Sequence, residues 1–333
     1  MHERLSQLDG LRGAAALSVF LAHAGCTLSG AAYAWAFHSP LRLLLDGEAA
    51  VDLFFVLSGF VLALPFLRGD GAGWAGFVLR RAVRLYPTHW AAFALAALVS
   101  GLVLAQNLNG WWAAYPVQAA PLALLEQVTL AGGRAAMDGI NPAIWTLAIE
   151  MQMALVFPFL LRALRGSATQ TLAVLLSTVL LGLDLRFWPL PLFAIGAAAA
   201  LWRPRLGHAA LAGLLLYAVR AWVPAMIDHY WGHILCGLGA ALLILAAADG
   251  RLPILQGRVV QALGRLSYAF YLVHLPLLLL AVSWLPSLPL AWAVALGAAL
   301  AAAAVLHRTV ELPSQRLGRR LAERFGGALG QGA

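Results

Sequence analysis

Residues 48–67 read EAAVDLFFVLSGFVLALPFL, and only Glu48 and Asp52 carry a charge in this stretch. An α-helix needs about 20 mostly apolar residues to cross the hydrocarbon core of a bilayer, which is about 30 Å thick. The stretch has that length, because each helical residue advances about 1.5 Å along the axis. It therefore predicts a membrane-spanning helix.

The rest of the chain has the same character. Its 333 residues are 62% hydrophobic and 11% charged, with a mean hydropathy of +0.83. A soluble domain carries about 25% charged residues. This composition argues against a water-soluble globular fold and favours a polytopic membrane protein. Two cysteines cannot form a disulfide scaffold or a four-cysteine metal site, and the nine histidines are scattered, so we expect no bound metal.

Apolar segments of spanning length recur along the chain. They predict an all-α polytopic membrane protein, a bundle of about ten transmembrane helices with both termini on one side. The ten expected spans are residues 11–29, 48–67, 86–105, 142–162, 168–184, 187–202, 207–223, 230–248, 265–284 and 286–307.

The distribution of arginine sets the expected orientation. The net charge is +8, and all 22 basic residues are arginine, a balance that in a soluble protein would suggest nucleic-acid binding. Here, however, most of the arginines gather on one side of the ten spans, which is the positive-inside asymmetry. Both termini are therefore expected in the cytoplasm, and no nucleic-acid partner is expected. The four arginines on the outer side are Arg42, Arg134, Arg186 and Arg220.

Several connecting segments have distinct compositions. Residues 106–141 form an expected outer loop with a short interfacial helix near 117–130, and residues 68–85 form an inner loop with four arginines. The membrane domain is expected over 1–310, and residues 311–333 form a basic cytoplasmic tail, partly disordered. Most of the tryptophans near the outer span ends are expected to form an interfacial belt; these tryptophans are Trp111, Trp112, Trp145, Trp188, Trp222, Trp231 and Trp284.

Ionisable residues inside the spans indicate a functional site, because a charged group in hydrocarbon is costly. His23, Glu150 and His274 lie in three different spans, each roughly 14 to 18 Å from the cytoplasmic edge by helical rise. Ser58 lies at a similar depth. A lone membrane histidine often serves only helix packing, and transporters line proton paths with the same residue types. Depth alone therefore indicates a site without naming its reaction.

Five ordered motifs carry a family resemblance. The chain resembles the membrane-bound acyltransferase-3 family, bacterial transferases that O-acylate glycans and some small molecules. The matching elements are LDGLRG at 8–13 with the Arg12-x10-His23 pair, VDLFFVLSGF at 51–60, RAVRLYP at 81–87, WTLAIE at 145–150 and LSYAFYLVHLP at 266–276. They span most of the chain, and the family's usual ten-span core agrees with the count of apolar segments.

The resemblance implies an acyl-CoA donor, usually acetyl-CoA, that enters from the cytoplasm as a substrate; no permanently bound cofactor is expected. It also implies a carbohydrate acceptor and residence in the bacterial cytoplasmic (inner) membrane. Planar guanidinium groups suit phosphate recognition. Arg12, Arg81 and Arg84 are therefore the expected contacts for the CoA phosphates.

Catalytic roles follow the same motifs. His23 is the expected general base for the acceptor hydroxyl, because an imidazole can take up a proton near neutral pH. Glu150 is expected to orient His23 or to accept a hydrogen bond from the acceptor. Tyr268, Tyr271 or His274 is expected to polarise the thioester oxygen. A covalent acyl-His23 intermediate is an open alternative.

Three other functions compete with this one. A secondary transporter or exporter of a small hydrophilic metabolite explains buried ionisable residues, but it predicts inverted repeats with interrupted helices, and none is clear. A non-catalytic scaffold leaves Glu150 unexplained. Within the enzyme class, the acceptor is alternatively a small molecule of the macrolide type, approached from the cytoplasm.

Overall fold

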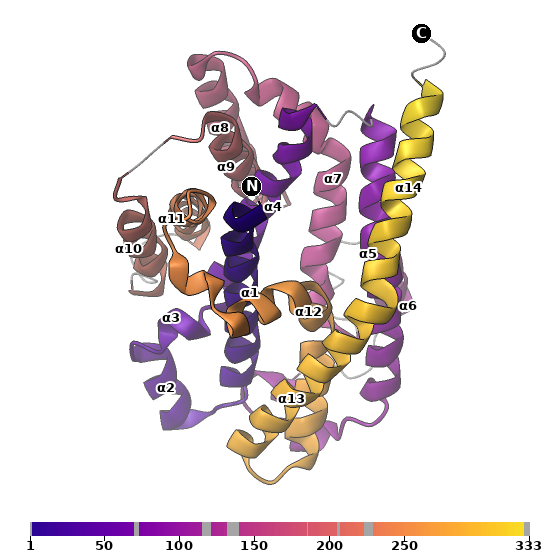
Figure 1. Ribbon diagram of the computed structural model, residues 1–333. Coiled ribbons are helices and arrows are strands. Elements are labelled where there is room, and N and C mark those ends of the chain that lie inside the picture. Colours follow the sequence, from indigo (N-terminus) through magenta and orange to yellow (C-terminus); the bar gives the residue numbers. More distant parts are fainter. Residues whose placement is uncertain are drawn as a thin grey trace. The chain divides into compact units, whose positions relative to one another are not determined.

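The computed structural model describes residues 2–69, 73–114, 121–131, 140–184, 186–204, 207–222 and 229–329 (Figure 1). In these ranges the chain is helical and contains no β-strand, as the apolar segments of spanning length predict. Arg134 and Arg205, which enter the orientation argument, lie outside the described residues, as do residues 330–333 of the expected tail.

Each of the ten expected spans overlaps a helix. The helices are α1 (His2–Gly25), α2 (Gly30–His38), α3 (Arg42–Leu45), α4 (Gly47–Arg68), α5 (Gly73–Ser100), η1 (Ala105–Asn107), η2 (Gly110–Ala114), α6 (Pro121–Thr129), η4 (Pro142–Ile144), α7 (Trp145–Leu164), α8 (Ala168–Gly182), α9 (Leu190–Trp202), α10 (Ala209–Trp222), α11 (His229–Ala248), η5 (Pro253–Gln256), α12 (Arg258–Trp284), α13 (Leu288–Leu306), η6 (His307–Glu311) and α14 (Leu312–Leu329).

Among the described residues, five helical stretches are both long and apolar enough to cross a membrane. This finding supports the all-helical membrane class, while the ten-span count and the orientation stay predictions. Helices α8 and α9 are shorter, and α1 and α5 have the length but carry polar residues toward one end. The five stretches are Gly47–Arg68, Pro142–Leu164, Tyr230–Ala248, Arg258–Trp284 and Leu288–Leu321.

The third span begins earlier than its hydropathy predicts. Helix α5 starts at Gly73 rather than near residue 86, so most of the expected inner loop 68–85 is helical. The expectation of a loop there was wrong because arginine is a good helix former even where it lowers the hydropathy. Arg81 and Arg84 therefore project from a helix. The short helix expected near 117–130 is confirmed over Pro121–Thr129 as α6, while residues 117–120 lie outside the described residues.

Most of the C-terminal segment is helical within the described residues. Residues 312–329, expected to be part of a partly disordered tail, form helix α14. The single π-helical turn η6 joins α13 to α14, so the chain is helical without a break over residues 288–329. Helix α14 packs beside α5 (Figure 1).

The chain divides into two compact units. The first comprises residues 1–17, 46–71 and 153–265, and the second comprises residues 18–45, 72–152 and 266–333. Helix α9 lies at the centre of the first unit, where its residues from Pro191 to Ala200 are all buried and pack against α4. The second unit contains α5 and α14 and most of the predicted site residues.

Two glycines allow α4 and α9 to approach closely. A Cβ atom at Gly59 would overlap the carbonyl oxygen of Phe193, and one at Gly196 would overlap the carbonyl oxygen of Val56. Small residues of this kind are typical of membrane helix interfaces, where packing rather than water exclusion drives association. The glycine of the VLSGF segment thus has a packing role.

Replacing Gly196 with alanine is expected to destabilise the protein. The added methyl group must push α4 and α9 apart, and overpacking of this kind costs about 1–3 kcal/mol. The melting temperature of the purified protein in detergent should fall. Gly297→Ala on α13 is the matched control, because a Cβ there meets nothing within 4 Å and alanine favours the helix. Equal melting temperatures for the two variants would contradict this packing role.

Candidate active site

The second unit brings His23 and His274 together. His23 lies in the last turn of α1, and the fully buried His274 lies in α12. His23 Nδ1 and His274 Nε2 are 2.8 Å apart, and the two ring planes are within 10° of each other. The two histidines, for which helical rise predicts a similar depth, are therefore joined by a direct hydrogen bond.

The neighbours of His274 determine which nitrogen of His23 is protonated. His274 Nδ1 lies 2.7 Å from the Tyr271 carbonyl oxygen, which can only accept, so this nitrogen carries the proton. In a neutral ring, Nε2 of His274 then accepts, and Nδ1 of His23 must donate to it. With both imidazoles neutral, the lone pair of His23 is therefore on Nε2, the position that a proton acceptor requires.

A proline explains why α12 presents this arrangement. Pro276 has no N–H group, so the Leu272 carbonyl one turn earlier loses its helical partner. The buried Asn141 replaces that partner, with its Nδ2 donating to the Leu272 oxygen at 2.7 Å. Gln127 holds Asn141 in turn through its Nε2, 3.0 Å from the Asn141 carbonyl. Asn141 was not predicted, although a proline inside a buried helix signals that such a donor is needed.

Trp112 fixes the end of α1. Its Nε1 donates to the His23 carbonyl at 3.0 Å, and its ring meets the imidazole edge-on with centroids 5.5 Å apart. Carbonyls in the last turn of a helix lack backbone partners, and this indole supplies one. The interfacial-belt interpretation is wrong for Trp112, which is 1% exposed. Trp231 and Trp284 are 45% and 61% exposed, as an interfacial position requires.

Glu150 is paired with Arg81. The two side chains form an ion pair between α7 and α5, and they are 23% and 10% exposed, respectively. A carboxylate at this depth needs a counter-charge, because desolvation of an isolated charge costs several kcal/mol. Arg84 lies three residues further along α5 and is half-buried. The side chain that contacts His23 Nδ1 is that of His274, and the expected role of Glu150 stays a prediction.

The two tyrosines have different partners. The Tyr268 hydroxyl donates to the Leu85 carbonyl at 2.8 Å, which ties α12 to α5. The Tyr271 hydroxyl lies 2.9 Å from Thr146 Oγ1, and in such a pair of hydroxyls either group can donate. The proton of Tyr268 is therefore committed to a backbone carbonyl, whereas the Tyr271 hydroxyl meets another side-chain hydroxyl.

Glu311 is a buried acid that the sequence motifs do not include. It lies in the π-turn η6 and is 3% exposed. Its carboxylate is 2.8 Å from His307 Nδ1 and accepts from Gln315 Nε2 at 3.0 Å. With Arg84, it lies within electrostatic range of Tyr268. Single π-turns occur often at functional sites, because they re-aim side chains without ending the helix.

Two polar groups of the motifs lie in the first unit. Arg12 Nη1 is 2.9 Å from Asp9 Oδ1 in a half-exposed pair within the LDGLRG segment. Asp52 is fully buried and bonds to His233 Nδ1 at 2.8 Å, while Trp188 packs on the imidazole with centroids 4.3 Å apart. The position of Asp52 in an apolar span is thus explained by a histidine that no motif indicates.

Comparison with known proteins identifies the class. The family model described as an acyltransferase domain matches residues 5–308, so the chain belongs to the acyltransferase-3 family and is an acyltransferase. It is 29% identical over 373 residues to "Acyltransferase MdmB" of Streptomyces mycarofaciens, covering 95% of this chain and 93% of that protein. It is 27% identical to "Nodulation protein 10" of Rhizobium leguminosarum bv. viciae, covering 96% and 95%. No solved structure matches. Family membership favours the enzyme over the transporter and scaffold alternatives.

Breaking the Arg81–Glu150 pair from either side is expected to destabilise the fold. Arg81→Met leaves the Glu150 carboxylate without this counter-charge. Glu150→Gln leaves the Arg81 guanidinium without this carboxylate partner. Each change should cost about 1–3 kcal/mol, discounted for the partial exposure of Glu150. The double variant should lose less than the sum of the two, because it buries no lone charge. Thermal melting of the four proteins in detergent measures this coupling, and additive losses would contradict it.

Proposed function

We propose that this protein transfers an acetyl group from cytoplasmic acetyl-CoA to a hydroxyl group of a carbohydrate, within the bacterial cytoplasmic membrane, with His23 as the general base. The observation that carries the proposal is the His23–His274 hydrogen bond of 2.8 Å. Together with the Tyr271 carbonyl contact to His274, it leaves Nε2 of His23 as the proton acceptor.

The reaction balances with these groups. His23 Nε2 takes the proton of the acceptor hydroxyl while that oxygen attacks the thioester carbonyl carbon. The tetrahedral intermediate then expels the CoA sulfur, and the imidazolium returns its proton to the leaving thiolate. The products are an ester and free CoA. During the charged interval, Nδ1–H of His23 keeps its hydrogen bond to His274, which holds the ring in place.

Tyr271 is the favoured donor to the thioester oxygen. Tyr268 gives its proton to the Leu85 carbonyl, and His274 gives its Nδ1 proton to the Tyr271 carbonyl. The Tyr271 hydroxyl meets the Thr146 hydroxyl instead of a backbone carbonyl, and two hydroxyls can exchange donor and acceptor roles. A positioned hydroxyl of this kind stabilises the oxyanion as it develops.

The CoA phosphates are assigned to arginines at the predicted cytoplasmic end. Arg84 on α5 is half-buried and adjoins the Arg81–Glu150 pair. In this assignment Arg84 contacts a phosphate directly, since a guanidinium matches phosphate oxygens in two parallel hydrogen bonds. Arg81 supports the same helix surface through Glu150, and Arg12 is a further contact.

The acceptor class rests on the family's preference for glycans. The relatives are named an acyltransferase and a nodulation protein, and neither name states an acceptor. A small-molecule acceptor of the macrolide type is the second candidate. The outer loops expected outside residues 106–141 are short, and they favour it in one respect, because they leave little surface for a large acceptor.

His23→Ala is expected to lower the transfer rate by about 10² to 10⁴, the usual contribution of a general base. Binding of acetyl-CoA should persist, because the imidazole is not assigned to the donor phosphates. The measurement is acetyl transfer by the purified variant beside titration calorimetry with acetyl-CoA. His38→Ala, an exposed histidine of the same unit, is the matched control. Full activity of His23→Ala would end the proposal.

The tautomer assignment predicts an order of activity at residue 274. Glutamine can place a carbonyl oxygen near the position of Nε2 and accept from His23 Nδ1, whereas alanine cannot. His274→Gln should therefore retain more of kcat than His274→Ala, at similar KM for acetyl-CoA. Equal loss of kcat in the two variants would mean that the hydrogen bond to His23 does not position the base.

The acceptor is identified by supplying [¹⁴C]acetyl-CoA to membranes that contain the protein and to membranes that contain His23→Ala. Label that depends on His23 should appear in polysaccharide or in a lipid-linked glycan, because transfer places the acetyl group on a hydroxyl. Label in a small organic product would favour the second candidate. Label in the protein itself, stable in denaturant, would favour the acyl-His23 alternative over direct transfer.

A further inference from the structure

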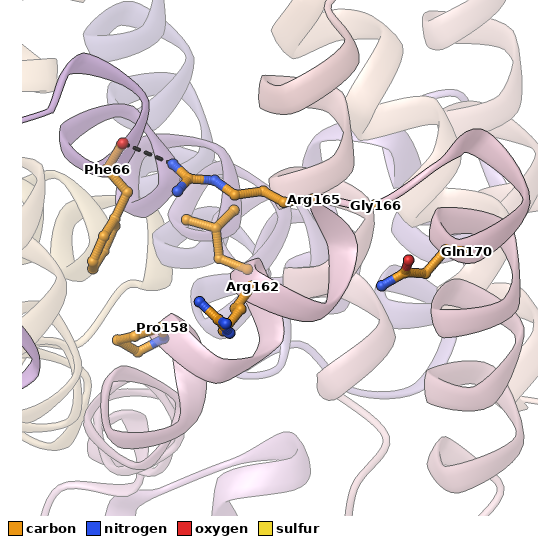
Figure 2. Close-up of a pocket in the computed structure, with 7 residues that line it drawn as sticks. Phe66, Pro158, Arg162, Arg165, Gly166 and Gln170 are labelled. Carbon is orange, nitrogen blue, oxygen red and sulfur yellow. Dashed lines mark hydrogen bonds between the residues drawn. The ribbon is translucent and has the colours of Figure 1, made fainter.

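A cavity of about 520 Å³ lies in the first unit, and none of its lining residues is assigned to catalysis or to CoA (Figure 2). It is formed by the last turns of α4 and α7 and the first turn of α8. Its lining residues are Phe66, Pro158, Leu161, Arg162, Arg165, Gly166 and Gln170.

The charge of this cavity is one-sided. Two of its lining residues, Arg162 and Arg165, are cationic, and none is acidic. Arg165 donates to the Phe66 carbonyl at 2.7 Å, which holds the end of α7 against the end of α4. Figure 2 shows the Arg162 guanidinium on the side of Pro158 and the Gln170 amide reaching from α8. No hydrogen bond or ion pair engages the Arg162 side chain among the described residues.

The start of α8 adds to the positive potential. Ser167 caps this helix, with its Oγ accepting from the Gln170 N–H at 3.2 Å. The other first-turn N–H groups have no helical acceptor, as at any helix N-terminus, and the helix dipole favours an anion there. An arginine at the end of α7 is explained by the dipole of its own helix. That dipole does not explain why two arginines lie beside a cavity that also contains the N-terminus of a second helix.

The helices beyond the cavity carry an exposed apolar surface. On α7, Phe159 is 64% exposed, and on α8, Leu172, Leu176 and Leu180 are 56%, 56% and 67% exposed. Such side chains in a membrane protein contact lipid chains. The cavity therefore lies where the lipid-facing apolar surface of α7 and α8 meets the basic end of α7, which carries Arg162 and Arg165.

We propose that this cavity binds the phosphate headgroup of an anionic phospholipid of the cytoplasmic leaflet. The phosphodiester anion pairs with Arg162 and the remaining N–H groups of Arg165, and the acyl chains lie along the apolar surfaces of α7 and α8. Basic pockets between membrane helices on the cytoplasmic side are suited to such headgroups. The expected orientation places this end of α7 in that leaflet.

A soluble phosphate would satisfy only half of the site. Inorganic phosphate and the nucleotide of acetyl-CoA offer the same anion, but neither extends acyl chains over Phe159 and Leu172. A phospholipid matches both surfaces. The two sources of phosphate therefore make different predictions for competition.

The experiment titrates delipidated protein in detergent with dioleoylphosphatidylglycerol and with dioleoylphosphatidylcholine, which has the same chains and no net charge. Native mass spectrometry gives the affinity for each lipid. The wild type should prefer phosphatidylglycerol, and Arg162→Gln should weaken its binding about fivefold, the effect of about 1 kcal/mol per arginine. Arg162→Lys should keep most of the preference, because it keeps the charge. Arg265→Gln, another exposed arginine of the same unit at the predicted cytoplasmic edge, should keep all of it.

Three results would overturn the proposal. The first is equal affinity of the wild type for the two lipids. The second is an equal loss in Arg162→Gln and Arg265→Gln, which would indicate general surface charge. The third is displacement of phosphatidylglycerol by millimolar inorganic phosphate or acetyl-CoA, which would assign the cavity to a soluble phosphate. Melting temperatures of the variants without lipid establish that each is folded.

Discussion

The cost of placing ionisable groups in a low-dielectric medium governs this structure. An unpaired charge or an unsatisfied polar group in hydrocarbon costs several kcal/mol, so each such group must find a partner on another helix or in another turn. Arg81 pairs with Glu150, His23 with His274, and Asp52 with His233. Each pair joins two helices that are distant in the sequence, and each occurs within one compact unit. The polar residues of the spans therefore determine which helices are neighbours.

The same constraint acts on the backbone. Pro276 leaves the Leu272 carbonyl without a helical donor, and the buried Asn141 side chain donates to it. The end of α1 leaves the His23 carbonyl without one, and the buried Trp112 side chain donates there. Both donors come from the region between α5 and α7, which hydropathy describes only as an outer loop. That region is therefore part of the support for the histidine pair, because it holds the two backbone segments from which the imidazoles project.

The sequence predicted where helices form better than it predicted which side chains meet. Apolar length and the rise per residue located the helices and placed His23 and His274 at a common depth. Neither quantity determines the direction in which a side chain leaves its helix, so the pairing of Glu150 with Arg81 was not foreseen. Hydropathy also missed the true start of α5, because arginine lowers hydropathy without breaking a helix. Glu311 was overlooked since a π-turn leaves no compositional signature.

Partner choice bears on the proposed chemistry. A histidine beside a carboxylate forms a pair that carries a negative charge at rest when the imidazole is neutral, and a low-dielectric site must then offset that charge. His23 is paired instead with a second imidazole, so the neutral pair carries no charge before the reaction. The carboxylate of Glu150 is balanced by Arg81. In the proposed mechanism, the site therefore acquires charge only while the proton is on His23, and it loses that charge when the thiolate leaves. A neutral acceptor hydroxyl and a neutral thioester can thus meet in a medium that would disfavour a permanent ion.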